Sequence, residues 1–432
     1  MSYADYPQHI EHLQRAAEAA LAQHKFEALI LCSGTAQARN RFDDQYWPLM
    51  PTPAYLHWCP LVEPDAFVIV RPGRRPTLVR TVVDDYWETP TPPESDHFWD
   101  AFDIVTVGPG HAGDVLPGGR VAVITRDPGH APPGEVNPVA LLATLDHART
   151  LKTAYEIECI AEATRRAVVG HRATEALFRS GEASELDIHF AYLTASQQDD
   201  AWTPYKNIVA LGPHCAVLHY IAYQRDAVAG ETSLLVDAGA RCQSYSSDIT
   251  RTYVRGNGAA AKRFGQLIER MDAMQQTIIT RVKPGKPYED LHDECHRLLA
   301  DVLIETGIGK SSAAELVDRG VTRALLPHGL GHSLGVTTHD VGMKLRPPRP
   351  ENKFLRNTSV IEAGQVFTIE PGIYVIDGLL GPLQADDRRD LLDWSAIADL
   401  RQFGGIRIED NVLVEGTGIR NLTREAFKAA AA

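Results

Sequence analysis

The sequence lacks any run of about 18 uninterrupted apolar residues, the length that a membrane-spanning helix needs. It also has few basic residues for its size, and its formal net charge is −13. A nucleic-acid groove needs a basic stripe to replace counterions on phosphate. We therefore expect neither a membrane span nor a nucleic-acid partner. The first 25 residues predict an amphipathic helix rather than a secretory signal.

Cysteine is scarce, and no two cysteines have the C-x-x-C spacing of a redox motif or a zinc site. In a long chain without a disulfide framework, scattered thiols indicate buried, reduced cysteines in a reducing compartment. We therefore expect a cytoplasmic protein. The six cysteines are Cys32, Cys59, Cys159, Cys215, Cys242 and Cys295.

The length of 432 residues predicts two domains, because single hydrophobic cores stop growing below this size. Short β-rich runs such as "AFVIVRPG" and "RVAVITRD" alternate with helical or irregular segments in the first part, which is an α/β pattern. Near residue 151 long helices begin, the first opened by Thr153 and Glu156 with the spacing of a capping box. Further long helices are expected at roughly 258–282 and 287–306. We place the domains at 1–150 and 151–432.

The stretch "PHGLGHSLGVTTHD" sets His328, His332 and His339 among several glycines. Three imidazoles so close together indicate a metal, a proton relay or coincidence. The H-x-x-x-H pair lacks the glutamate of H-E-x-x-H, and glycines interrupt it, so a helical zinc protease site is not expected. Glycines beside imidazoles fit a backbone that passes close to a cofactor or substrate.

Four carboxylates occur in or beside apolar, strand-like runs, where burying an unpaired charge costs several kcal/mol. Each one therefore needs a cation or a hydrogen-bond donor. Four acids of this kind and an imidazole suit a pair of divalent cations, and oxygen ligands favour Mn, Mg or Co over a structural zinc. The acids are Asp237 in "SLLVDAGA", Asp248 in "YSSDITRTYV", Glu370 in "QVFTIEPGIYV" and Glu409 in "GGIRIEDNVLV".

Each of these residues also has a structural explanation when it is taken alone. An aspartate at a strand end is commonly a turn or cap residue. Glu409 beside Arg407 is compatible with a structural ion pair. His328 or His339 alone is compatible with a hydrogen-bonded structural histidine. The metal hypothesis depends on the joint pattern, because all the separate explanations would have to hold at once.

The motifs "VDAGA", "SDITRTY", "HGLGH…THDVG", "TIEPGIY" and "GIRIEDNV" occur in this order over most of residues 205–415. They resemble those of the pita-bread metallopeptidases, in particular the bacterial Xaa-Pro dipeptidases (prolidases), whose relatives include the organophosphorus acid anhydrolases. "LILCSG" and "FDDQYWP" in the N-terminal half are similar too. The resemblance implies an α/β N-terminal domain and an α+β pita-bread C-terminal catalytic domain.

The resemblance also implies a dinuclear metal site with two Mn²⁺ per subunit, or Co²⁺ or Zn²⁺ in their place. Asp248 and Glu409 would bridge the two ions, and a hydroxide between the ions would be the nucleophile. The five implied ligands are Asp237, Asp248, His332, Glu370 and Glu409.

Further roles follow from the same resemblance. Glu370 would also transfer the proton, His339 would stabilise the tetrahedral intermediate, and His219 would lie on the substrate side. Arg356 would bind the free carboxylate of the dipeptide. The other implied pocket residues are Arg407, Tyr205 and His328. Two positions depart from the family pattern: Thr338 replaces a usual valine, and Pro213 replaces the glutamate usual in the dipeptidase subgroup, which leaves the loop near His214 in question.

The expected activity is hydrolysis of small dipeptides ending in proline, with a secondary phosphotriesterase activity by analogy with the anhydrolases. The same resemblance implies a homodimer in which the N-terminal domain of one subunit covers the partner's active site, and the segment of Asp43 and Asp44 is our candidate for this lid. Aminopeptidase P is the nearest rival enzyme. The intact set of five ligands disfavours creatinase, and the N-terminal domain disfavours methionine aminopeptidase. A catalytically inactive pita-bread module that binds peptides or histones is the alternative from a different class.

Overall fold

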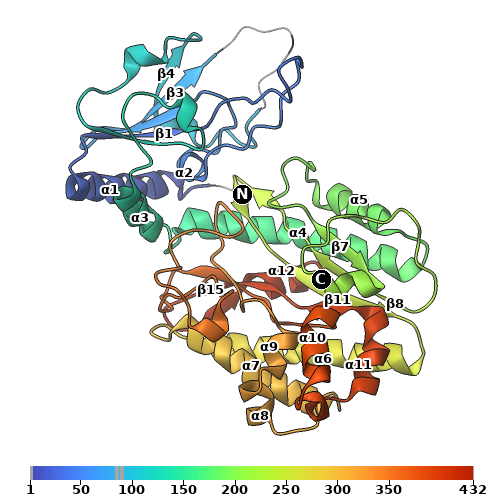
Figure 1. Ribbon diagram of the computed structural model, residues 1–432. Coiled ribbons are helices and arrows are strands. Elements are labelled where there is room, and N and C mark those ends of the chain that lie inside the picture. Colours follow the sequence, from blue (N-terminus) through green and yellow to red (C-terminus); the bar gives the residue numbers. More distant parts are fainter. Residues whose placement is uncertain (1–2, 83–86, 88–91, 432) are drawn as a thin grey trace. The chain divides into compact units, whose positions relative to one another are not determined.

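The computed structural model describes residues 3–82, 87 and 92–431, and it divides into two compact units (Figure 1). The N-terminal unit comprises Met1–Cys159 with Gln243–Tyr245. The C-terminal unit comprises Ile160–Cys242 with Ser246–Ala432. The domain boundary that we expect near residue 150 stays a prediction.

The N-terminal unit contains a six-stranded mixed sheet in the order β4-β3-β2-β1-β5-β6. Strands β1 and β5, β5 and β6, and β3 and β4 pair in parallel. The runs that form β1, β2 and β5 are buried on both faces, and Ile30, Ile69 and Val123 belong to one core cluster. The α/β expectation for this half is confirmed. Its elements are α1 (Tyr6–His24), β1 (Ala28–Cys32), α2 (Pro53–Leu56), β2 (Phe67–Val70), β3 (Thr77–Thr81), β4 (Asp103–Val107), β5 (Val121–Ile124), β6 (Glu135–Val136) and α3 (Val139–Ala148).

Helices and short strands alternate in the second part of the chain. The first of these helices, α4, carries the expected capping box, because Thr153 N donates to Glu156 Oε2 (2.9 Å) and Glu156 N donates to Thr153 Oγ1 (3.4 Å). The elements are α4 (Ala154–Ser180), α5 (Glu185–Ser196), β7 (Ile208–Leu211), β8 (Thr232–Asp237), β9 (Arg241–Cys242), β10 (Tyr245–Ser246), β11 (Thr250–Arg255), α6 (Ala259–Thr280), α7 (Tyr288–Glu305), α8 (Ala313–Asp318), α9 (Val321–Leu325), β12 (Val366–Ile369), β13 (Gly372–Tyr374), α10 (Asp377–Ala385), α11 (Trp394–Leu400), β14 (Gly405–Arg407), β15 (Asp410–Val414), β16 (Ile419–Asn421) and α12 (Leu422–Ala429).

The strands of the C-terminal unit form small antiparallel sheets with helices packed against them. One sheet has the order β11-β8-β7, a second has the order β12-β15-β16, and β13 pairs with β14. Tyr192 of α5 and Val236 of β8 share one core cluster, and Leu291 of α7 and Phe367 of β12 share another. The carboxylates described below lie at or beside the ends of these strands.

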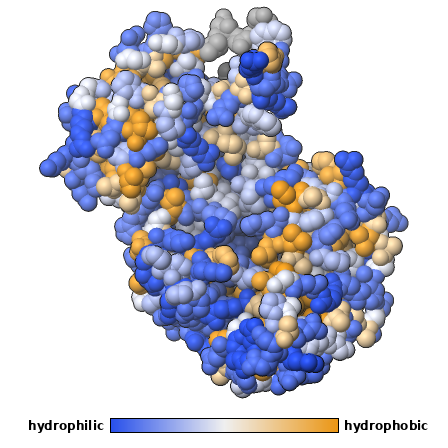
Figure 2. Space-filling model, in the orientation of Figure 1, coloured by the Kyte–Doolittle hydropathy of each residue, from blue (hydrophilic) through white to orange (hydrophobic). Residues whose placement is uncertain are grey.

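The visible surface is mostly hydrophilic on both units. Hydrophobic residues lie on it in small separate groups (Figure 2). Among the described residues, no helix is both long enough and apolar enough to cross a bilayer.

Candidate metal centre

Four carboxylates lie at the ends of buried strands in the C-terminal unit. Asp237 is the last residue of β8 and pairs with Thr250, the first residue of β11. Asp248 lies two residues before β11, so strand alternation points it to the same side as Thr250. Glu370 follows β12 directly, and Glu409 lies in the short break between β14 and β15. Residues far apart in the chain are therefore positioned by neighbouring strand ends.

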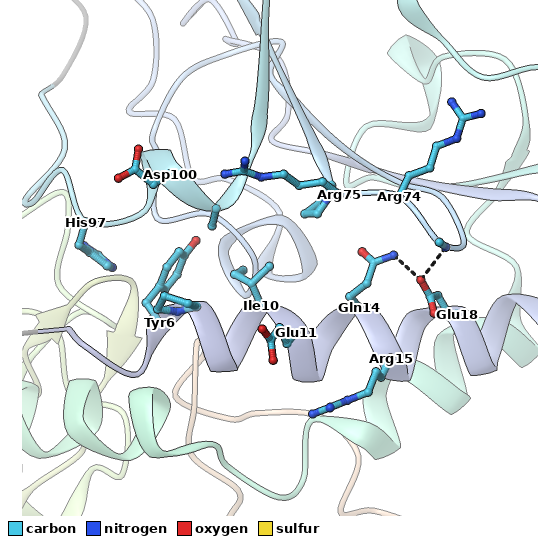
Figure 3. A pocket seen from close by; sticks show the side chains of 14 residues that line it. Tyr6, Ile10, Glu11, Gln14, Arg15, Glu18, Arg74, Arg75, His97 and Asp100 are labelled. Atoms are coloured by element: carbon cyan, nitrogen blue, oxygen red, sulfur yellow. Dashed lines mark hydrogen bonds between the residues drawn. The ribbon is translucent and has the colours of Figure 1, made fainter.

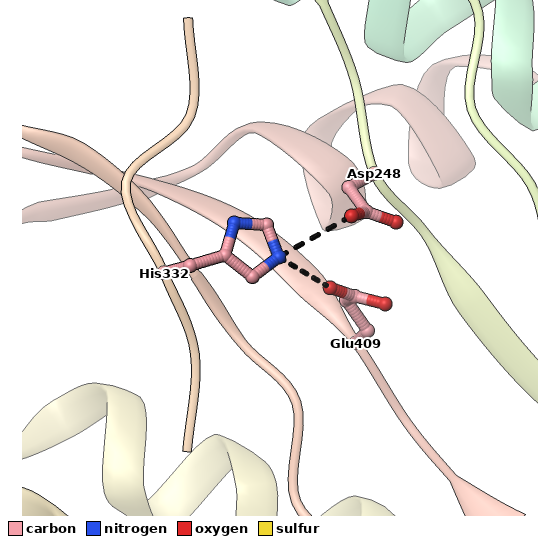
Figure 4. Close-up of side chains that lie close together, drawn as sticks. All are labelled: Asp248, His332 and Glu409. Carbon is pink, nitrogen blue, oxygen red and sulfur yellow. Dashed lines mark ion pairs between the residues drawn. The ribbon is translucent and has the colours of Figure 1, made fainter. Parts of the chain in front are cut away.

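Three of these acids lie close to the imidazole of His332. One potential ligand atom each from Asp248, His332 and Glu409 lies within 4.8 Å of the others, and His332 faces both carboxylates (Figure 4). His332 Nε2 is 3.4 Å from Asp248 Oδ2 and 3.9 Å from Glu409 Oε1. The same nitrogen is 3.5 Å from Glu370 Oε1. Three of the expected carboxylate ligands therefore surround the Nε2 atom of the expected imidazole ligand.

Asp237, the fifth expected ligand, is joined to this group by Tyr205 and Arg407. The Tyr205 hydroxyl lies 2.7 Å from Asp237 Oδ1 and also contacts Asp248 Oδ1. Arg407 donates from Nη2 to Asp237 Oδ2 at 2.5 Å and from Nη1 to the Tyr374 hydroxyl at 2.9 Å. The structure thus brings all five residues and two of the expected pocket residues into one cluster.

Burial and mutual repulsion shift the pKa values of these carboxyl groups. Burial, together with Asp248, raises the pKa of Glu409 well above its usual range. Burial and the charge of Asp237 raise the pKa of Asp248, and burial raises the pKa of Glu370 to about 7. Burial alone would also raise the pKa of Asp237, but the charge of Arg407 and the hydrogen bonds from Tyr205 and Arg407 together outweigh burial and lower this pKa. The cluster therefore carries more buried negative charge than the protein itself neutralises.

The unsatisfied groups of the cluster match what a divalent cation supplies. Among the described residues, Glu409 Oε1 is buried without a hydrogen-bond partner. A bound cation would compensate such an oxygen and would lower the raised pKa values of its carboxylate ligands. The donor set is mostly carboxylate oxygen with one imidazole, which suits hard or borderline divalent ions. The residues present therefore fit a divalent metal cofactor.

A cavity of about 570 Å³ opens onto the cluster, within the range of small-ligand sites. Lys344 and Lys353 also line it. Tyr205 is the one expected site residue that does not line the cavity, and it reaches the cluster through its hydroxyl group instead. The expected site residues in the cavity wall are Asp237, Asp248, His219, His328, His332, His339, Arg356, Glu370, Arg407 and Glu409.

Two further imidazoles of the cavity, those of His328 and His339, are neutral near pH 7. Burial lowers the pKa of His339 and of His328 to about 3. The His339 ring stands edge-on to His332, with 4.3 Å between ring centroids. His328 contacts the Tyr374 hydroxyl through Nε2 (2.9 Å) and its own chain at Gly329 O through Nδ1 (2.8 Å). A neutral imidazole can donate one hydrogen bond and accept another, which suits contacts to a substrate carbonyl.

The histidine loop lies along β12 as an irregular extra strand. Thr368 N donates to His332 O (2.9 Å), Glu370 N donates to Leu330 O (2.8 Å) and Leu334 N donates to Val366 O (3.1 Å). Gly329 and Gly331 of this loop line the cavity, and Gly331 also passes close to the neighbouring strand. A Cβ atom at Gly331 would lie 2.0 Å from Thr368 O, so this glycine makes room for protein backbone.

Three contributors to the site were not identified from the sequence. Thr250 Oγ1 donates to Glu409 Oε2 (2.6 Å), and Asn411 Oδ1 accepts from Asp248 N (3.3 Å). Tyr374 links His328 to Arg407. Thr250 shares the strand face of Asp248, and Asn411 shares that of Glu409, so period-two alternation could have indicated both. No local pattern indicates Tyr374.

The structure shows the surroundings of the two departures from the family pattern, Pro213 and Thr338. His214, beside Pro213, contacts Glu185 Oε1 through Nδ1 at 2.7 Å and stacks on Tyr220 with 4.4 Å between ring centroids. This loop is thereby anchored to the start of α5. Among the described residues, the buried Thr338 Oγ1 has no hydrogen-bond partner.

A second cavity, of about 700 Å³, lies in the N-terminal unit along α1 (Figure 3). Gln14 and Gly73 both donate to Glu18 Oε1 in its wall, at 2.8 Å and 2.9 Å. Its charged residues have both signs and are spread along the cavity, and none belongs to the metal-ligand group found among the described residues. The cavity of the C-terminal unit is therefore the candidate active site.

Comparison with protein families agrees with this location. The model of metallopeptidase family M24 matches residues 158–416, and the model of the Xaa-Pro dipeptidase N-terminal domain matches residues 4–147. A Xaa-Pro dipeptidase of Marinobacter nauticus is 40% identical over 423 residues, which is 97% of either chain. A Xaa-Pro dipeptidase of Pseudoalteromonas translucida is 38% identical over 437 residues, again 97% of either chain.

Solved structures share the fold over the whole length. Aminopeptidase PepP of Pseudomonas aeruginosa superposes with a TM-score of 0.74 at 23% identity, covering 98% of both chains. Zinc-substituted aminopeptidase P of E. coli in complex with product superposes with a TM-score of 0.73 at 20% identity, with the same coverage. These likenesses confirm the two-part architecture with a pita-bread C-terminal domain. The M24 family model and the full-length relatives imply an enzyme with a divalent metal cofactor, and the chain belongs to metallopeptidase family M24.

Proposed function

We propose that this protein is a metal-dependent dipeptidase that hydrolyses Xaa-Pro dipeptides. The observation that carries the proposal is the convergence of four carboxylates and His332 on one cavity. Relatives that match 97% of the chain at 38–40% identity carry the name Xaa-Pro dipeptidase, which supports this substrate class.

We further propose that the cluster holds two Mn²⁺ ions, with Asp237, Asp248, His332, Glu370 and Glu409 as ligands. Manganese is preferred because four of the five donors are carboxylates, although Co²⁺ and Zn²⁺ also accept such ligands. A pair of divalent ions lowers the pKa of water and polarises a carbonyl group, which suits the bond to proline, an imide bond without an N–H.

The side chains of the cavity supply the remaining chemistry. Glu370 takes the proton of the attacking water and returns it to the prolyl nitrogen, as general base and then general acid. His339 donates a hydrogen bond to the oxygen on which negative charge develops, and its low pKa keeps it a neutral donor. His219 contacts the substrate from the cavity wall. Arg407 and Tyr205 hold Asp237 and Asp248 in position.

The direct test compares substrate length and metal dependence. With added Mn²⁺ the protein should hydrolyse Leu-Pro and Gly-Pro, and it should cleave Ala-Pro at least about 100-fold faster than Ala-Pro-Ala, because a closed site rejects the extra residue. Proline release measures each rate. Chelation should remove the activity, and Mn²⁺ should restore it. Faster cleavage of Ala-Pro-Ala would favour an aminopeptidase P. A stable protein without stoichiometric metal would favour an inactive binding module.

Arg356 is proposed to bind the free carboxylate of the dipeptide. It is exposed in the cavity wall, and no hydrogen bond or ion pair of its side chain is found among the described residues. Arg356→Ala should raise KM for Leu-Pro at least about tenfold with little change in kcat, because a bidentate carboxylate contact is lost. Arg356→Lys should have an intermediate effect, since it keeps the charge and loses the planar fork. An unchanged KM in Arg356→Ala would refute the assignment.

We also propose a homodimer. The segment of Asp43 and Asp44 exposes the large side chains of Phe42 and Trp47, which are 83% and 58% accessible. Such exposed aromatic residues are typical of interfaces. Asp43 accepts hydrogen bonds from Gln45 N and from the Asn40 side chain within its own turn. Full activity of a monomer in sedimentation experiments would contradict the dimer. All six cysteines are buried, which supports our proposal of a cytoplasmic location.

A further inference from the structure

A side chamber of about 380 Å³ adjoins the active-site cavity in the C-terminal unit. It shares a wall with that cavity, and part of this wall is His328, whose Nδ1 is 3.8 Å from Glu370 Oε2. The chamber therefore begins next to the proposed reaction centre. The residues that line both spaces are Pro327, His328, Lys353, Phe354 and Leu379.

Two buried imidazoles without partners line the chamber. His292 and His296 lie one turn apart on α7, their ring centroids are 4.7 Å apart, and their accessible fractions are 2% and 1%. Among the described residues, neither Nδ1 atom has a hydrogen-bond partner. Each Nδ1 atom is fully enclosed by protein, so a ligand in the chamber would meet the rest of each ring rather than this atom. Nothing in the proposed chemistry uses these two residues.

The charges around the chamber favour an anionic ligand over a cation. Arg323 lines the chamber and reaches Asn352 Oδ1 at 3.2 Å and Asp293 Oδ1 at 3.7 Å. Lys353 lies 4.8 Å from the Phe354 ring and forms no ion pair among the described residues. The one carboxylate of the wall, Glu351, is 4.0 Å from Arg349.

The protonation state of His292 and His296 agrees with this distribution of charges. Burial, with the positive charge of Arg323, lowers the pKa of His292 to about 4, and burial with His292 and Arg323 lowers that of His296 to about 2. Both rings are thus neutral near pH 7, and each has one N–H to donate. The positive potential that lowers these pKa values also disfavours a bound metal cation.

We propose that this chamber, lined by His292, His296, Arg323 and Lys353, binds the carboxylate side chain of an acidic first residue in the dipeptide. The inference depends on the proposed Xaa-Pro dipeptidase function. The first residue is the part of the substrate with a variable side chain, because the proline ring is apolar and its carboxylate is assigned to Arg356. Arg323 and Lys353 in the chamber wall would attract a carboxylate and donate hydrogen bonds to it, whereas an apolar side chain would gain neither contact.

The test is the ratio of kcat/KM for Glu-Pro to that for Leu-Pro. His292→Leu and His296→Leu should each lower this ratio at least about tenfold, mainly through KM for Glu-Pro, as expected for a lost hydrogen bond to a charged group. His296→Gln, which keeps a donor, should retain more of the ratio. Lys353→Gln, at an exposed position where folding is not at risk, should also lower it. Thermal unfolding checks that each variant is folded.

The matched control is His189→Leu, which removes another buried imidazole of the same unit, on α5 and outside both cavities. It should leave the ratio unchanged. An unchanged ratio in the His292, His296 and Lys353 variants would overturn the inference. Equal losses for Gly-Pro, Leu-Pro and Glu-Pro would also overturn it, because the chamber would then contact a part that all substrates share. A wild-type protein inactive on all three dipeptides would instead refute the proposed function, and the inference with it.

Discussion

Asp248→Ala should reduce the hydrolysis of Leu-Pro by about 10³-fold or more, and it should lower the bound metal below its full stoichiometry. Asp248 lies centrally, since its carboxylate contacts both Tyr205 and the His332 imidazole. Proline release and metal analysis of the dialysed protein measure the two effects.

The same variant separates a functional role from a structural one. In the metal-free protein Asp248 is repelled by Asp237, and burial disfavours its charge. Removing it should therefore leave the thermal unfolding temperature of the metal-free protein equal or higher, while the stabilisation gained from added Mn²⁺ should be lost. The control Asp399→Ala removes a half-exposed acid that pairs with Arg263 at 3.3 Å and should change neither property. A fully active Asp248→Ala would refute the dinuclear site.

Glu370→Gln should lower kcat for Leu-Pro by about 10²–10⁴-fold with a smaller change in KM, the range expected when a general base is removed. The amide keeps the shape and one oxygen ligand but cannot accept the proton of water. The side chain at position 370 should keep its hydrogen bond in this variant. Thr368 Oγ1 lies 3.4 Å from Glu370 Oε1 and can donate to an amide oxygen as well.

Steady-state kinetics with the metal content measured in the same sample checks the expectation for Glu370. The matched control is Glu362→Gln, an exposed glutamate just before β12, which should leave kcat unchanged. If Glu370→Gln bound full metal and kept the wild-type kcat, the proton would be transferred by another group, and the proposed role would be wrong.

Much of the local structure follows from the sequence because it depends on short-range patterns. The apolar runs around Ile30 and Val123 form buried strands, and the Thr153–Glu156 pair caps α4 as expected. The site residues follow from a different principle, namely that charged groups in apolar strands need partners. That principle indicates which residues require an explanation, and the motif order then assigns them to one cluster.

Other features depend on pairings between distant segments, which no local pattern contains. The run that contains Arg407 and Glu409 reads as one alternating segment, yet it is divided into β14, which pairs with β13, and β15, which pairs with β12. The His292–His296 pair is visible in the sequence as H-x-x-x-H. Its position beside the active-site cavity comes only from the packing of α7 against the segment of residues 323–328.

The main-chain hydrogen bonds between the histidine loop and β12 determine how the ligands His332 and Glu370 lie relative to each other. Leu330, His332 and Leu334 bond to alternate residues of the strand, so the offset between His332 and Glu370 is fixed by peptide groups rather than by side-chain packing. Insertions or deletions are compatible with the site only outside residues 330–334. A slip of one residue would turn the imidazole to the opposite side of the strand and separate it from Asp248, Glu370 and Glu409 at once.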